Sequence, residues 1–184
     1  MNSRAGRAAA ADLDLRLRAA VRDVPDFPQP GILFRDLSPL LADPALFRVT
    51  ADALAALYLD VGITSVVAIE SRGFLFGPSV AERLDVGLVP TRKVGKLPGE
   101  TVREAYALEY GAATLEMHRD ALGAGDRVLV VDDVLATGGT AAAAGRLVER
   151  CGAAVGGFAF VVAIAGLGGR AALGSAAVTT LLDL

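Results

Sequence analysis

The sequence predicts an α/β fold built on a central, mostly parallel β-sheet flanked by helices, and three observations lead to it. Short apolar runs alternate along the chain with longer segments whose apolar residues recur at helical spacing. Two of these runs, 128–131 and 158–165, contain no polar residue, which is typical of strands covered on both faces. A glycine-rich turn joins the first of them to an alanine-rich helical segment, so strand and helix alternate as a parallel sheet requires.

The N-terminal part is expected to hold two helices. Apolar residues at helical spacing over 13–24 predict a helix that ends before a proline, and the prolines and glycine of 28–31 predict turns. Asp43, followed by proline, is typical of a helix start. We expect this second helix to bury Leu57 and to stop at Gly62.

The rest of the chain continues the alternation. Strands are expected at 65–69, 87–91, 105–110, 113–118, 126–131, 158–165 and 177–182, and helices from 73 to about 84, up to 151 and near 170. No internal repeat or linker interrupts this order, so we expect a single domain over 12–184 that follows a disordered tail at 1–11.

Composition excludes several classes of protein. A hydrophobic content of 53% is too high for a disordered chain, and a net charge of −3 lacks the basic footprint of a nucleic-acid-binding protein. Residues 151–169 are uncharged over the length of a membrane span. Glycines interrupt that stretch, so we interpret its apolar part as a buried strand and expect no membrane contact. The single cysteine, Cys151, cannot form an intrachain disulfide, which fits a reducing compartment, and we expect a cytoplasmic protein.

The most informative segment follows the strand at 128–131. Asp132 and Asp133 come first, and a short loop then leads through Thr137 and two glycines to a helix. Unpaired N–H groups and the positive end of the helix dipole bind phosphate at such a turn. Successive strand side chains point to opposite faces, so both carboxylates can face one ligand only where the strand gives way to the loop. The segment predicts a site for a phosphorylated ribose, made by residues that carry carboxylates, hydroxyls or free backbone: Asp132, Asp133, Ala136, Thr137, Gly138, Gly139 and Thr140.

The glycine-rich segments have other interpretations. Two aspartates before two glycines also suit an ordinary loop with a capping threonine. The lysine of an ATPase-type phosphate loop is missing here. Residues 166–171 fit the dinucleotide pattern G-x-G-x-x-A, but too little chain follows to complete that fold, so we interpret them as a turn.

Two further segments are candidates for anion binding. Ser71 and Arg72 follow a predicted strand end, where open α/β sheets bind ligands, although a surface arginine would look the same. Arg92, Lys93 and Lys96 lie in a stretch that is basic within an acidic protein and carries glycines and a proline. Such a stretch could be a mobile lid over an anion or simply a solvated loop.

Four motifs in register resemble the type I phosphoribosyltransferases. The strand and glycine-rich loop resemble their phosphoribosyl-pyrophosphate (PRPP) motif, and the Leu-Ala-Thr-Gly-Gly-Thr version resembles the adenine-specific members. Residues 27–36 resemble the base-pocket segment, 70–74 the pyrophosphate loop, and 92–99 with Leu-Glu-Tyr-Gly at 108–111 the catalytic loop. The resemblance runs from about residue 12 to the C-terminus and implies a type I phosphoribosyltransferase fold with a small N-terminal hood and a mobile catalytic loop.

The resemblance implies a role for each motif. Adenine and PRPP would give AMP and pyrophosphate, with Glu109 as the catalytic acid/base, while Glu104 and Glu116 differ from it only in motif position. Pyrophosphate would meet Ser71, Arg72, Arg92, Lys93 and Lys96, and adenine would meet Leu33, Phe34 and Arg35. Mg²⁺ would be held by substrate and water rather than by protein ligands, and the resemblance implies a homodimer. A phosphoribosyltransferase for xanthine or hypoxanthine and a non-catalytic PRPP-sensing regulator remain as alternatives.

Overall fold

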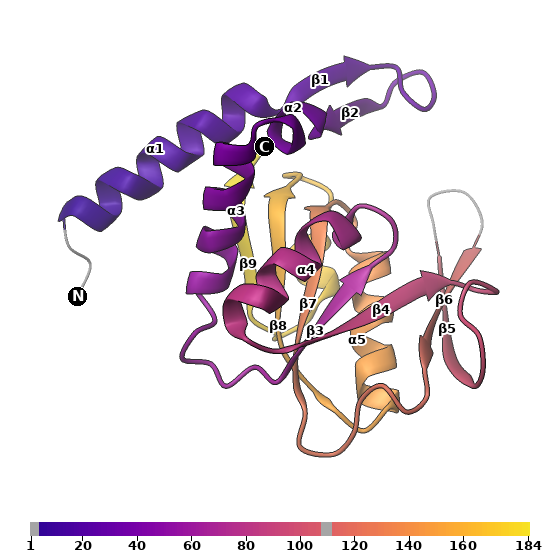
Figure 1. The fold of residues 1–184 in the computed structure, drawn as a ribbon. Coiled ribbons are helices and arrows are strands. Elements are labelled where there is room, and N and C mark those ends of the chain that lie inside the picture. Colours follow the sequence, from indigo (N-terminus) through magenta and orange to yellow (C-terminus); the bar gives the residue numbers. More distant parts are fainter. Residues whose placement is uncertain (1–3, 108–111) are drawn as a thin grey trace. The chain divides into compact units, whose positions relative to one another are not determined.

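The computed structural model describes residues 4–107 and 112–184 (Figure 1). The chain divides into two compact units, Met1–Asp52 and Ala53–Leu184, which are described separately. Within the described ranges no helix combines the length and the apolar character that a membrane span needs.

The N-terminal unit contains helices and a two-stranded antiparallel hairpin. Its elements are α1 (Arg4–Ala20), β1 (Arg22–Pro25), β2 (Leu33–Asp36), α2 (Ser38–Ala42) and the first part of α3 (Pro44–Ala56). Helix α1 therefore includes most of the segment that the sequence assigned to a tail. The prediction of a helix up to residue 24 was wrong, because residues 22–25 pair with β2. A valine directly before proline favours extended backbone, which suits this pairing.

Helix α3 begins as its sequence predicts. The Asp43 carboxylate accepts hydrogen bonds from the backbone N–H groups of Ala45 (2.9 Å) and Leu46 (3.0 Å), which makes it the N-cap. The helix ends at Ala56, before the predicted stop at Gly62. Leu57, which was expected to be buried, lies past that end and is 56% exposed.

The C-terminal unit is built on a seven-stranded sheet with the strand order β5-β6-β4-β3-β7-β8-β9. Its strands are β3 (Ser65–Ile69), β4 (Gly87–Lys93), β5 (Thr101–Ala107), β6 (Ala112–His118), β7 (Arg127–Leu135), β8 (Ala154–Ala163) and β9 (Val178–Asp183). Five neighbouring strands pair in parallel, in the spatial order β4-β3-β7-β8-β9. At one edge β6 pairs antiparallel with β4, and β5 pairs antiparallel with β6. The predicted fold class, a mostly parallel sheet with flanking helices, is confirmed (Figure 1).

The centre of the sheet is as apolar as its sequence requires. Residues Val128, Leu129, Val130 and Val131 of β7 are fully buried, because helices cover the sheet on both faces. Helix α4 (Gly73–Leu84) connects β3 to β4, and α5 (Gly139–Arg150) connects β7 to β8. These connections run in opposite directions along the sheet, so right-handed crossovers put the two helices on opposite faces.

This reversal of direction creates a crevice between β3 and β7. The ladder between the two strands ends at the pair Ala68 and Val131. Beyond it β7 continues for four residues along β8 only. In open α/β sheets ligands bind at such a point, outside the carboxyl ends of the strands. The sequence placed the strand end at 131, but pairing with β8 holds the backbone extended to Leu135.

Candidate functional site

A cavity of about 320 Å³ lies at the carboxyl ends of β3 and β7. Its walls come from the turn before α4, from the end of β4 and from the whole segment between β7 and α5. It is lined by Glu70, Ser71, Arg72, Lys93, Tyr106, Phe160 and residues 132–141. All seven residues predicted for the phosphorylated ribose thus lie on one cavity with three of the five predicted for pyrophosphate.

Arg72 and Asp133 join the two walls. The Arg72 Nε atom lies 2.8 Å from Asp133 Oδ2. Asp133 is only 2% exposed, and burial raises the pKa of its carboxyl although the Arg72 charge opposes the rise. The peptide bond between Glu70 and Ser71 is cis. A buried carboxylate therefore orients the guanidinium at the cavity, and a guanidinium is a group that binds anions.

Asp132 shares the same wall but a different environment. Its Oδ1 atom accepts a hydrogen bond from the Asp133 backbone N–H at 2.9 Å. Helix α4 begins close by, since a Cβ atom added to Gly73 would lie 3.1 Å from that carboxylate. Burial and then the charge of Asp133 raise the pKa of Asp132 well above its usual range. Both aspartates reach the cavity from within β7, so the expectation that the strand ends before them was wrong.

The segment after β7 forms an anion cradle at the start of α5. Gly138 is the N-cap residue and has a φ of +83°, a left-handed conformation that favours glycine. The first backbone N–H groups of a helix have no partner within it, and here Gly139, Thr140 and Ala141 line the cavity. A Cβ atom on Gly138 would meet the Gly169 carbonyl oxygen at 2.6 Å. A side chain at Gly138 would thus point towards residues 169–172 and not into the cavity.

The basic segment after β4 is only partly turned to the cavity. Lys93 lines it, and its backbone N–H donates to Glu70 Oε2 at 2.8 Å. Arg92 is turned away, because it pairs with Glu70 Oε1 at 3.2 Å and donates to the Lys96 carbonyl at 3.2 Å. Lys96 is not among the lining residues. Of the three predicted basic residues, the structure brings one to the cavity.

Glu116 of β6 holds this segment in place. Its Oε1 atom accepts the backbone N–H groups of Lys96 (2.9 Å) and Leu97 (3.0 Å), and its other oxygen lies 3.3 Å from Arg103 Nε. Burial opposes ionisation, but these backbone bonds outweigh it and lower the pKa of Glu116. The sequence did not predict this role for Glu116. A charged residue between two apolar neighbours on a strand was the one signal that pointed to a buried carboxylate with partners.

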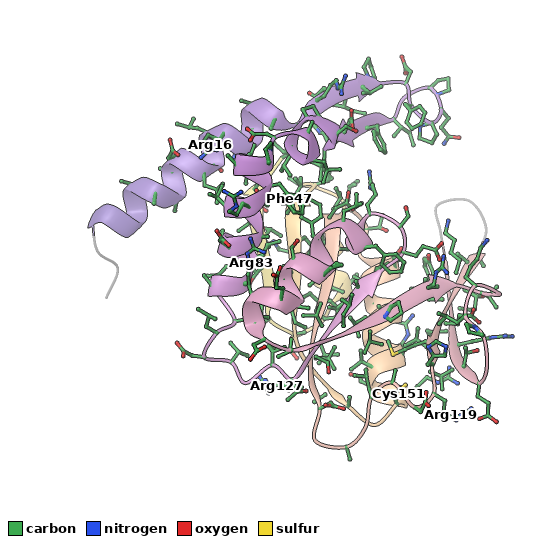
Figure 2. The ribbon with its side chains drawn as sticks, viewed as in Figure 1. Arg16, Phe47, Arg83, Arg119, Arg127 and Cys151 are labelled. Carbon is green, nitrogen blue, oxygen red and sulfur yellow. The ribbon has the colours of Figure 1, made fainter. Side chains whose placement is uncertain are left out.

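His118, the last residue of β6, and Cys151 have contacts beside that strand. The His118 ring nitrogen Nε2 donates to the Pro98 carbonyl at 2.9 Å. Cys151, labelled in Figure 2, follows α5 and lies with its Sγ atom 3.9 Å from the His118 carbonyl. Burial raises the pKa of this thiol, so it is a poor nucleophile.

The remaining predicted residues lie elsewhere. Leu33, Phe34 and Arg35 form most of β2 in the N-terminal unit. The Phe34 ring packs edge-on against Phe27, with centroids 5.1 Å apart, and Arg35 pairs with Asp23. Glu109 lies outside the described residues.

Comparison with known proteins agrees with this geometry. A family described as "Phosphoribosyl transferase domain" matches residues 36–173. The adenine phosphoribosyltransferase of Anaeromyxobacter sp. (strain Fw109-5) is 57% identical over 167 residues, which are 91% of this chain and 94% of that protein. The crystal structure of adenine phosphoribosyltransferase from Rhodothermus marinus has 52% identity and a TM-score of 0.90, and covers 95% of this chain and 99% of its own.

A third match is to a ligand complex. The Saccharomyces cerevisiae adenine phosphoribosyltransferase, crystallised with D-2,5-dideoxy-2,5-imino-altritol 1,6-bisphosphate and adenine, is 45% identical with a TM-score of 0.88. The match covers 94% of this chain and 99% of that one. The chain belongs to the phosphoribosyltransferase family and, within it, groups with the adenine phosphoribosyltransferases.

Proposed function

We propose that this enzyme transfers the phosphoribosyl group of PRPP to adenine, giving AMP and pyrophosphate in purine salvage. The observation that carries the proposal is the single cavity that places a helix N-terminus, two aspartates and Arg72 on neighbouring strand ends. In PRPP the helix N-terminus would bind the 5′-phosphate, the two aspartates would bind the ribose, and Arg72 would bind the pyrophosphate.

The phosphate and ribose are assigned to the wall made by residues 132–140. Backbone N–H groups at the start of α5 and the hydroxyls of Thr137 and Thr140 would hold the 5′-phosphate. Asp132 and Asp133 would accept hydrogen bonds from the ribose hydroxyls. Burial and then the charge of Asp133 raise the pKa of Asp132, so its carboxyl keeps its proton to higher pH than an ordinary aspartate and, while protonated, can donate as well as accept a hydrogen bond.

Pyrophosphate is assigned to the opposite wall. Ser71, Arg72 and Lys93 line the cavity there, and Arg92 and Lys96 would join them only after their present bonds to Glu70 and to each other rearrange. Pyrophosphate should leave before the base attacks, through a ribosyl cation-like transition state. The protein would then contribute placement and electrostatic stabilisation.

Adenine recognition is assigned to Leu33, Phe34 and Arg35, with Phe34 stacking on the base and the main chain of its neighbours pairing with the polar edge. Glu109 is assigned the proton at N7 of adenine as N9 attacks C1′. Both assignments rest on the motifs of the sequence. The yeast relative crystallised with adenine supports the choice of base.

We also propose that the cavity takes Mg²⁺ as an ion held mainly by substrate and water. Asp132 and Asp133 are the carboxylates that would hold its water shell. When bound, the ion would neutralise charge on the pyrophosphate.

A cytoplasmic homodimer is also proposed. The reduced single cysteine supports the compartment. Large exposed apolar side chains such as Leu57, Leu59 and Leu75 support self-association, and sedimentation equilibrium measures it directly.

One assay tests the proposed function. Each of adenine, hypoxanthine, guanine and xanthine is supplied with PRPP and Mg²⁺, and nucleotide formation is followed by chromatography. Adenine should be preferred by about 10⁴-fold, because a site that pairs with one polar edge rejects another. Equal turnover of hypoxanthine would contradict the adenine assignment, and no turnover of any base would contradict the enzymatic one.

A further inference from the structure

The segment after β8 packs directly on the phosphate cradle. Helix α6 (Gly169–Ala172) begins within the glycine-rich run 166–171, which was predicted to be a turn. A Cβ atom added to Gly169 would overlap the Ala136 carbonyl oxygen and lie 2.9 Å from Leu135 Cγ. Two backbones therefore meet at this point without a side chain between them.

The contact is reciprocal. A Cβ atom on Gly138 would lie 2.6 Å from the Gly169 carbonyl oxygen and 2.9 Å from the Ala172 Cβ atom. The same two segments also border a cavity of about 360 Å³, whose lining includes Ala136 and Gly169. The close approaches at Gly138 and Gly169 therefore bring the backbone of α6 directly against the cradle.

Arg170 fastens α6 to the last strand. Its guanidinium donates to the Val178 carbonyl at 3.2 Å and to Thr180 Oγ1 at 2.5 Å, and it pairs with Asp183 at 3.1 Å. Because β9 pairs with β8 in the sheet, these bonds connect the short helix to the seven-stranded sheet. Arg170 is half exposed and points away from the phosphate cradle's ligand side, where it is not a lining residue.

We infer that Gly169 is a positioning residue for the 5′-phosphate. Helix α6, which Arg170 holds against β9, fixes the position of the Ala136–Thr140 backbone through the contact at Gly169, and so fixes the direction in which its N–H groups point. The inference rests on the proposed function, because it needs that backbone to bind the phosphate. Hydrogen bonds to phosphate depend steeply on donor geometry, and misplacement by about 1 Å can cost about 100-fold.

The test compares three ligands on Gly169→Ala by isothermal titration calorimetry. AMP and ribose 5-phosphate carry the 5′-phosphate, and magnesium pyrophosphate does not. The added methyl group must displace the Ala136 carbonyl, so the affinities for AMP and ribose 5-phosphate should fall about tenfold or more. Pyrophosphate affinity should change less than twofold, because Arg72 and Lys93 stand on the other wall.

Two matched variants separate positioning from general damage. Gly174→Ala places a methyl group in the same segment, at a φ of +65° but with nothing within 4 Å, and should leave all three affinities unchanged. Arg170→Ala removes the fastening from an exposed position without a steric clash, and should weaken the two phosphoribosyl ligands severalfold but not pyrophosphate.

The outcomes are distinct. Unchanged AMP affinity in both Gly169→Ala and Arg170→Ala would overturn the inference, as would an equal loss for all three ligands. If Gly169→Ala does not fold, Arg170→Ala alone decides. Failure of the wild-type protein to bind either phosphoribosyl ligand would instead overturn the proposed function.

Discussion

Replacing Asp132 by asparagine should stabilise the ligand-free enzyme while weakening it as a catalyst. The half-buried Asp132 carboxyl stands beside the buried Asp133 carboxyl in one wall of the cavity. Asparagine has the same shape, its Oδ1 atom can still accept the Asp133 backbone N–H, and its amide nitrogen can donate to the neighbouring carboxylate. The variant thus removes one of two adjacent charges and leaves no group unpaired.

The pH dependence follows from the direction of the pKa change. Burial and Asp133 raise the pKa of Asp132 in the folded protein above its value of 3.8 in the unfolded chain, so the folded state holds the proton to higher pH. Its charged form therefore reduces stability as the pH rises from 3.8 towards the raised pKa. Each pH unit of that interval is worth about 1.4 kcal/mol, or about 3–5 °C in melting temperature for a chain of this size.

Differential scanning calorimetry of wild type and Asp132→Asn between pH 4 and pH 8 measures this difference. The variant should melt at a higher temperature than wild type at pH 7.5, and the gain should vanish towards pH 4. Asp126→Asn is the matched control at the other end of the same strand, since that carboxylate accepts bonds from Gly123 and Thr64 and its loss should bring no gain. A lower melting temperature for Asp132→Asn at pH 7.5, or a gain independent of pH, would refute the reasoning.

Four further predictions address separate parts of the site. Gly138→Ala should lose about 1–3 kcal/mol of folding free energy in urea titrations, because of its φ of +83° and its contact with Gly169; an unchanged midpoint would contradict this. Lys93→Ala should raise the KM for PRPP more than Lys96→Ala does, since only Lys93 lines the cavity, and equal effects would place both lysines on pyrophosphate. Glu109→Gln should lower turnover about 10²- to 10⁴-fold with PRPP affinity nearly intact, and near-normal turnover where chemistry limits the rate would exclude the acid/base role. Tyr58→Phe, which removes a donor to the Phe158 carbonyl at 3.0 Å, should cost about 1 kcal/mol of stability without altering KM.

The strand and helix order of the C-terminal unit could be predicted because local signals agree with the packing. The run at 65–69 forms β3 and the helix after Arg72 ends at Leu84, both within the predicted bounds. The sequence also placed residues 132–140 at one site, and they line one cavity because they follow each other along the end of β7 and the turn into α5. These patterns are short-range, and the packing of the sheet favours the same structure that they favour locally.

Other features depend on partners that the sequence does not place side by side. The hairpin of β1 and β2 forms through pairing between segments that each look like turn or helix. Arg92 was expected at pyrophosphate, but Glu70 and the Lys96 carbonyl bind its guanidinium first. Nothing in the sequence shows that the missing side chain of Gly138 makes room for Gly169, 31 residues further along the chain. In each case a contact distant in the chain decides which of several reasonable interpretations holds.

The crevice between β3 and β7 has a consequence for the order of folding events. Its walls belong to strands separated in the chain by α4, β4, β5 and β6, so the cavity exists only after this long-range pairing has formed. Non-local pairing is slow and late, and a ligand that binds only the completed sheet stabilises the native state rather than the barrier to it. AMP should therefore slow unfolding in stopped-flow experiments while leaving the refolding rate unchanged. It would stabilise the folded enzyme without helping the chain to fold.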